Sequence, residues 1–200
     1  CGKLAGVGNE CPHCGAKQDA FGMRLRRAVG PLSDQHGGLS VTSALLTVNG
    51  FLFIAALAVG GLGGGGAFDL LTPNIQVMFR LGLQDTAAID AGHWWRLVLP
   101  IFLHLGLLHV AFNCYLLHFA GQLLEADMGS RLLFTLYMVA GLSGTIASYA
   151  FDIGGAGASG AVMGLLAAIL VRRRLLDGDF KHPLSQQLLF LIGINVVFGL

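Results

Sequence analysis

Charged side chains are scarce in this sequence. Asp, Glu, Lys and Arg make up 12% of its 200 residues, against about a quarter in an ordinary soluble domain. Hydrophobic residues make up 54%, and the mean hydropathy is +0.71. The net charge of +1 gives no sign of a nucleic-acid partner. The 30 glycines follow no G-x-y period, which excludes collagen and is typical of closely packed membrane helices.

Five apolar segments follow one another after residue 40. They cover approximately residues 41–61, 105–124, 132–151, 159–171 and 184–200. Most approach the roughly 20 residues that a spanning helix needs. The fourth is shorter, so we expect its helix to begin below the membrane surface. The pattern predicts an all-α, polytopic transmembrane helical bundle.

Basic residues set the expected orientation of these spans. If the N-terminus is cytoplasmic and the spans alternate, all but Arg80 and Arg96 of the 12 Lys and Arg residues lie on the cytoplasmic side. This distribution follows the positive-inside rule. It places the beginnings of the second and fourth segments together at the outer side.

The first 40 residues carry a cysteine knuckle, Cys11-Pro-His-Cys14-Gly, and Cys1-Gly2 has the form of the second half of another. Two such knuckles hold a structural zinc through four thiolates. We interpret residues 1–30 as a zinc-ribbon-like tail with Cys1, Cys11 and Cys14 as ligands, and residues 31–40 as a linker. The alternative is a flexible tail with unpaired cysteines. The chain starts at Cys1 and stops in an apolar run, so we expect a longer protein.

A serine flanked by glycines begins the fourth apolar segment. Glycines around Ser159 leave its hydroxyl uncrowded, as a nucleophile requires. The same composition suits close helix packing, because Gly160, Gly164 and Ala168 fall on one helical face. Taken alone, this motif favours packing over catalysis.

Two polar residues, His109 and Asn113, share one face of the second segment because they are four residues apart. A polar side chain in a spanning helix is costly unless it has a partner. Both residues serve either as interhelical hydrogen-bonding groups or as donors to an oxyanion near Ser159. Two donors at the depth of Ser159 favour the second interpretation. His118 belongs to another face.

The connection over residues 63–100 is long and ends in Trp94-Trp95-Arg96. Indole and guanidinium groups suit the membrane interface. The segment is therefore either a simple interfacial anchor or a loop half-sunk in the outer leaflet.

Four motifs together give residues 41–200 a family resemblance. They are Gly92-His-Trp-Trp-Arg96, His104-x4-His109-x3-Asn113, Glu125-x3-Gly129 and Gly157-Ala-Ser-Gly160. Their order resembles that of bacterial-type rhomboid intramembrane serine proteases. The resemblance implies a rhomboid membrane domain over residues 41–200 with five of six core helices, truncated before the sixth.

By this resemblance Ser159 is the nucleophile, and His109, Asn113 and the Ser159 backbone N–H form the oxyanion hole. The general base is a histidine of the sixth helix, beyond residue 200, so the 200-residue chain alone is expected to be inactive. Met163 stands where the family often has an aromatic residue. Residues expected to support the substrate or the loops are His104, Gly157, Trp95, Arg96 and Glu125.

The implied activity is endopeptidase cleavage of transmembrane-helix substrates near the outer membrane face by a Ser-His dyad. The expected partners are single-pass or multi-pass membrane proteins and the lipid bilayer, with no nucleic acid and no catalytic cofactor. The expected location is the bacterial inner (plasma) membrane, with the N-terminus cytoplasmic. The alternative is a catalytically inactive rhomboid-like protein that binds or escorts membrane proteins.

Overall fold

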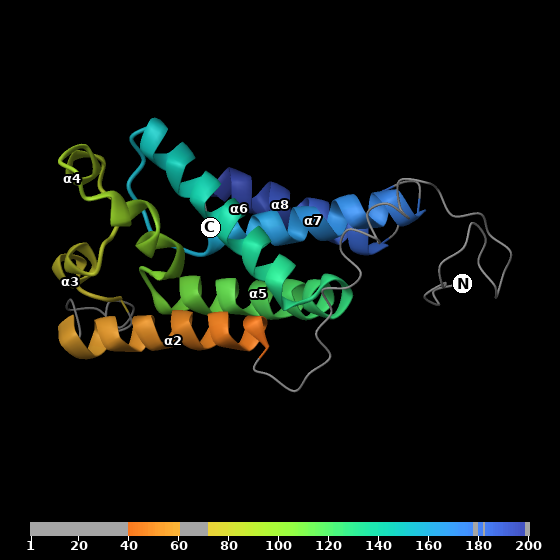
Figure 1. Ribbon diagram of the computed structural model, residues 1–200, viewed down its shortest axis with the longest axis horizontal. Helices are drawn as coiled ribbons and strands as arrows, with labels where there is room; N and C mark the ends of the chain where they lie inside the picture. The colour runs from red at the N-terminus through yellow and green to blue at the C-terminus, as the bar shows by residue number, and fades with distance from the viewer. Residues whose placement is uncertain (1–39, 61–71, 178–179, 182, 199–200) are drawn as a thin grey trace, which may run out of the picture.

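The computed structural model describes residues 40–60, 72–177, 180–181 and 183–198, which form a bundle of helices (Figure 1). Its longer helices are α2 (Val41–Gly60), α5 (Leu107–Met128), α6 (Ser130–Ala150), α7 (Ser159–Asp177) and α8 (Pro183–Phe198). Over the described ranges no strand is present, only an isolated bridge between Gln84 and Gly155. The predicted all-α bundle is confirmed. The expected ligands Cys1, Cys11 and Cys14 lie outside the described residues.

Each of the five predicted apolar segments is a helix, but the fourth is longer than its hydropathy indicated. Helix α7 continues through the three arginines at 172–174 to Asp177. Arginine is a good helix former, and Arg172 forms an ion pair with Asp127 of α5. The end of an apolar run is therefore not the end of this helix.

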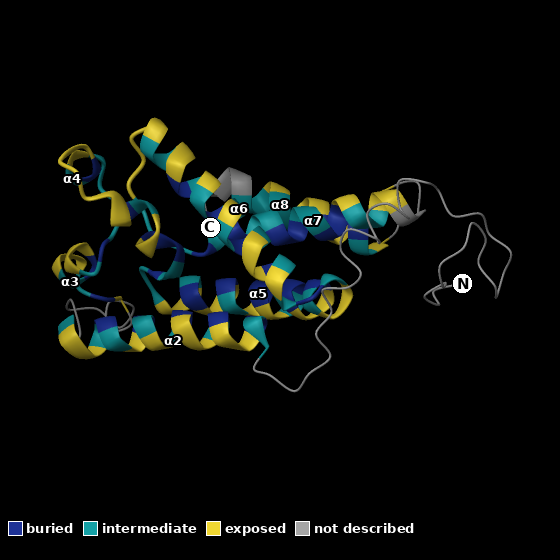
Figure 2. Ribbon diagram, in the orientation of Figure 1, coloured by how far each residue is buried: buried dark blue, intermediate teal, exposed yellow. Residues whose placement is uncertain are grey.

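Within the described residues, three helices are long and apolar enough to cross a membrane: α2, α5 and α6. Their outer faces expose large apolar side chains, which Figure 2 shows most plainly along α2. Examples are Phe51, Ile54, Val59, Leu108, Val139 and Ile146. Such a surface is rare on soluble monomers, whereas lipid tails solvate it.

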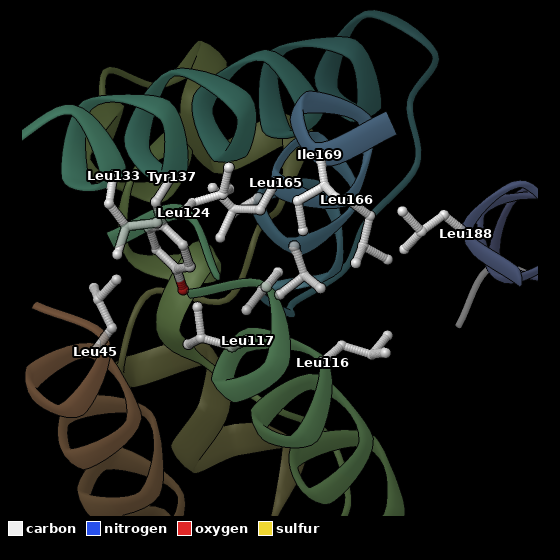
Figure 3. Close-up of a cluster of buried hydrophobic side chains, with 14 of the residues drawn as sticks. Leu45, Leu116, Leu117, Leu124, Leu133, Tyr137, Leu165, Leu166, Ile169 and Leu188 are labelled. Atoms are coloured by element: carbon white, nitrogen blue, oxygen red, sulfur yellow. The ribbon is translucent and has the colours of Figure 1, made fainter. Parts of the chain in front are cut away.

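Helix α7 lies at the centre of the bundle and shares one buried apolar cluster with the four other long helices (Figure 3). Leu165 and Leu166 are fully buried in the same cluster as Leu117 of α5 and Tyr137 of α6. Leu188 joins this cluster from α8. The beginning of α7 is thus held by neighbours from α5 and α6.

Glycine permits α6 and α7 to approach closely. A Cβ built at Gly164 would collide with the Cβ of Ala140, and one at Gly160 would lie 3.5 Å from the Cα of Gly144. Small residues of this kind let membrane helices pack backbone to backbone. The packing face predicted from Gly160 and Gly164 is therefore present.

The connection between α2 and α5, predicted as an interfacial anchor or a half-sunk loop, contains short helical pieces over residues 72–106. These are α3 (Ile75–Arg80), α4 (Thr86–Asp90), η3 (Trp94–Leu97) and η4 (Leu99–Phe102). The first two begin with side-chain caps, since Asn74 accepts from the N–H of Gln76 and Asp85 accepts from the N–H of Ala88. We call residues 72–106 the first loop.

Glu125, in the last turn of α5, joins three helices. Its carboxylate accepts hydrogen bonds from the backbone N–H groups of Val41 and Thr42, at 2.6 and 3.0 Å, at the start of α2. The hydroxyls of Ser40, Thr42 and Ser130 also donate to it, at 2.7, 2.6 and 2.6 Å. A negative charge at a helix N-terminus is favourable, and it supplies acceptors for N–H groups that have none within the helix.

We predict that Glu125→Ala destabilises the bundle by roughly 2–3 kcal/mol, because five donors lose a charged acceptor at once. Gln122→Ala, an exposed position of the same helix, is the matched control and should leave the unfolding midpoint in detergent unchanged. Equal midpoints for the two variants would contradict the joining role of Glu125.

Candidate active site

Ser159 is the first residue of α7, and α7 begins inside the bundle. After α6 ends at Ala150, the chain runs back along the molecule before α7 starts (Figure 1). We call residues 151–158 the serine loop. Its last residue, Ala158, is fully buried, and the Ala158 carbonyl accepts from the N–H of Val162 at 2.8 Å. The hydroxyl of Ser159 therefore lies at a helix N-terminus, where free N–H groups and the helix dipole favour negative charge.

Gly157 brings His109 and Ser159 to the same small space. An atom at the Cβ position of Gly157 would lie 2.7 Å from Nε2 of His109 and 3.7 Å from Oγ of Ser159. Gly157 also has a φ of +145°, a conformation that side chains rarely adopt. The missing side chain lets the imidazole lie directly against the backbone beside the serine.

The imidazole of His109 has an unused hydrogen-bonding atom at this point. Its Nε2 is buried and has no hydrogen-bond partner within the described part of the chain. The ring packs edge-on against that of His104, with the centroids 5.2 Å apart. Burial, with a smaller contribution from His109, lowers the pKa of His104 to about 4, so His104 is neutral at neutral pH.

Asn113 lies one turn beyond His109 on α5 and is almost fully buried. Its Nδ2 donates to the backbone carbonyl of His109 at 2.9 Å, which uses one of the two amide hydrogens. The second amide hydrogen remains available as a donor. His118, which the helical spacing assigns to another face, is exposed.

The first loop holds the serine loop at two points. The N–H of Gly157 donates to the carbonyl of Pro100 at 2.9 Å, and the N–H of Gln84 donates to the carbonyl of Gly155 at 3.2 Å. Neither Pro100 nor Gln84 was singled out from the sequence. Both contacts are between residues far apart in the chain, so no local pattern could have revealed them.

Two residues of the Trp-Trp-Arg motif have different surroundings. Arg96 is buried, donates from Nη1 to the carbonyl of Leu83 at 2.6 Å, and lies 4.0 Å above the centre of the Phe79 ring. Trp95 is exposed and stacks on His93, with the ring centroids 4.8 Å apart. Arg96 thus stabilises the first loop from within, while Trp95 lies on its surface, as an interfacial side chain would.

The described residues contain no group of three or more His, Cys, Asp or Glu side chains placed to hold a metal ion. Met163, one turn beyond Ser159, is partly buried against the central cluster. The candidate site therefore consists of Ser159 and His109 beside Gly157, with His104 against the His109 ring and Asn113 one helical turn beyond His109.

The model of the Rhomboid domain family matches residues 91–200, which is more than half of the chain. This chain belongs to the rhomboid family. With its apolar helices, the rhomboid domain makes it a membrane protein.

Several curated rhomboid proteins are similar to the chain. Rhomboid protease GluP of Bacillus subtilis (strain 168) is 36% identical over 127 residues, which are 63% of this chain and 25% of that protein. RHOMBOID-like protein 1 of Arabidopsis thaliana is 35% identical over 138 residues, 66% of this chain and 35% of that protein. Rhomboid-like protease 2 of Toxoplasma gondii is 29% identical over 142 residues, 70% of this chain and 50% of that protein. The chain thus spans half or less of each of these relatives.

We predict that Gly157→Ala destabilises this rhomboid domain by roughly 1–3 kcal/mol, because a methyl group would press on His109 and the backbone has a positive φ. Gly155→Ala is the matched control, since a Cβ there would meet nothing within 4 Å. Thermal unfolding in detergent measures both. Indistinguishable midpoints would contradict the close contact between Gly157 and His109.

Proposed function

We propose that the protein is a serine endopeptidase that cleaves transmembrane helices of other membrane proteins within the bilayer, through a Ser-His dyad. The observation that supports this most directly is the arrangement at Gly157, where Ser159 Oγ and Nε2 of His109, the proposed oxyanion donor, lie close to the same point. Relatives named as rhomboid proteases support the same reaction class.

In the proposed reaction, Ser159 Oγ attacks the carbon of the scissile carbonyl while a base removes the hydroxyl proton. The carbonyl oxygen becomes an oxyanion in a tetrahedral intermediate. The base then gives its proton to the leaving amine, the C–N bond breaks, and water hydrolyses the acyl group on Ser159.

The oxyanion requires donors arranged in advance, because polar groups fixed in an apolar site need no rearrangement as charge develops. His109 is suited to this role because Nε2 is buried without a partner among the described residues. Asn113 has a second amide hydrogen beside the one bonded to the His109 carbonyl. The backbone N–H of Ser159 at the start of α7 supplies the third donor.

We assign the general base to a histidine that follows residue 200. The histidines described by the structure are His93, His104, His109 and His118, and none of them forms a hydrogen bond with Ser159. His93 and His118 are exposed, His109 is assigned to the oxyanion, and His104 is assigned to support of the first loop. The 200-residue chain alone is therefore proposed to be inactive.

The positive-inside distribution of Lys and Arg supports a cytoplasmic N-terminus and an active site that opens toward the outer face. Cleavage is accordingly proposed near the outer end of the substrate helix, in a bacterial inner membrane. The scissile segment must be extended, because a helix engages its carbonyls in hydrogen bonds.

The test is cleavage of a transmembrane reporter by the full-length protein. Ser159→Ala should abolish cleavage, because the nucleophile is lost. Asn113→Ala should slow it roughly 10- to 1,000-fold, since one oxyanion donor is removed and the backbone N–H remains. The exposed His118→Ala on the same helix should cleave at the wild-type rate. Undiminished cleavage by Ser159→Ala would refute the proposal, and a wild type that binds the reporter without cleaving it would favour the inactive, escorting alternative.

A further inference from the structure

Gln84 lies between α3 and α4 in the first loop, ahead of residues 91–200 that match the rhomboid family. It is only 5% exposed, although glutamine is usually a surface residue. A buried carboxamide is stable only when its polar atoms have partners. Its position therefore indicates a specific contact.

The side chain of Gln84 is bonded to α6. Its Nε2 donates to the backbone carbonyl of Thr145 at 2.8 Å, and this hydrogen bond is buried. The hydroxyl of Thr145 in turn donates to the carbonyl of Leu97 at 2.7 Å. The first loop is thus attached to one residue of α6 from two directions.

The backbone of Gln84 is bonded to the serine loop. Its N–H donates to the carbonyl of Gly155, and a Cβ at Gly154 would lie 3.5 Å from the carbonyl oxygen of Gln84. Two residues further on, Gly157 donates to Pro100. The approach to Ser159 is therefore held at Gly155 by Gln84 and at Gly157 by Pro100.

We propose that Gln84 is a positioning residue for the reaction at Ser159. Its carboxamide fixes residue 84 to α6, and its N–H then fixes the serine loop, which sets the place of the Ser159 hydroxyl and N–H. Ser159 itself belongs to α7, which packs on α6 through Gly160. Gln84 thus connects the serine loop, which precedes Ser159, to α6, on which the helix of Ser159 packs.

The inference rests on the proposed protease function. Displacing reacting groups by about 1 Å costs on the order of 100-fold in rate. A loosened serine loop should therefore lower kcat. KM should change little, because Gln84 is not proposed to contact the substrate.

The experiment measures kcat and KM for a transmembrane reporter, with the full-length protein in detergent or vesicles. Gln84→Met keeps the approximate length of the side chain but removes the donor, and kcat should fall about 10- to 100-fold with KM within about twofold. Gln76→Met replaces an exposed glutamine of the same loop and should match the wild type.

Gln84→Glu provides a second readout. The introduced carboxylate cannot donate to the Thr145 carbonyl, whereas the protonated carboxyl group can. Since burial favours the neutral acid, the activity of this variant relative to the wild type should rise as the pH falls. If Gln84 only helped the protein to fold, Gln84→Glu would lower the amount of folded protein. The kcat of each folded molecule, relative to the wild type, would then not change with pH.

The outcomes separate the two proposals. If the wild type shows no cleavage that depends on Ser159, the protease function fails and this inference fails with it. If the wild type cleaves and folded Gln84→Met has an unchanged kcat, the positioning role alone is overturned. If Gln84→Met does not fold, the test depends on folded Gln84→Glu. The positioning role is then overturned if the activity of that variant relative to the wild type does not rise as the pH falls.

Discussion

The close approach of α6 and α7 is the contact on which the rest of the arrangement depends. Gly160 and Gly164 have no side chains to hold the helices apart, so α7 can occupy the centre of the bundle. In lipid this packing has no hydrophobic driving force to support it, and it relies on the fit of small residues. Because Ser159 directly precedes Gly160, the packing also determines where the serine hydroxyl lies. The two interpretations of the glycine-serine motif, packing and catalysis, are therefore compatible.

Polar groups in this apolar bundle fall into two sets. One set joins the first loop together and to α6: Arg96 Nη1 donates to the Leu83 carbonyl, Gln84 donates to Thr145, and Thr145 donates to Leu97. By contrast, Nε2 of His109 has no partner among the described residues. Asn49 and Ser185 also have buried polar atoms without partners, so an unsatisfied group alone does not identify a site. His109 differs from them because it lies beside Gly157 and Ser159.

The sequence predicts the helices well because each is a long apolar run. The limits found for α2, α5 and α6 lie within a few residues of the predicted ones. It fails at the end of α7, where three arginines continue the helix after the apolar run has ended. Prediction from the sequence misses the helices of the first loop altogether, because α3 and α4 are too short to show a hydrophobic period.

The candidate site is predictable only in part. The spacing of His109 and Asn113 on one helix, and the glycines around Ser159, indicate a shared location without any structure. Gln84 could not be found in this way, because its bond to Thr145 joins residues 61 positions apart. The closeness of Gly157 to His109 is likewise a property of the packed chain. The zinc site predicted at Cys1, Cys11 and Cys14 lies outside the described residues and stays a prediction.

The central claim is that Ser159 is a nucleophile activated by a base that follows residue 200. Reaction with a fluorophosphonate probe, followed by mass spectrometry of the modified peptide, measures this directly. We expect an adduct on Ser159 in the folded full-length protein, no adduct after denaturation, and much slower labelling of residues 1–200 alone. An adduct on a different serine, or labelling of residues 1–200 at the full-length rate, would contradict it.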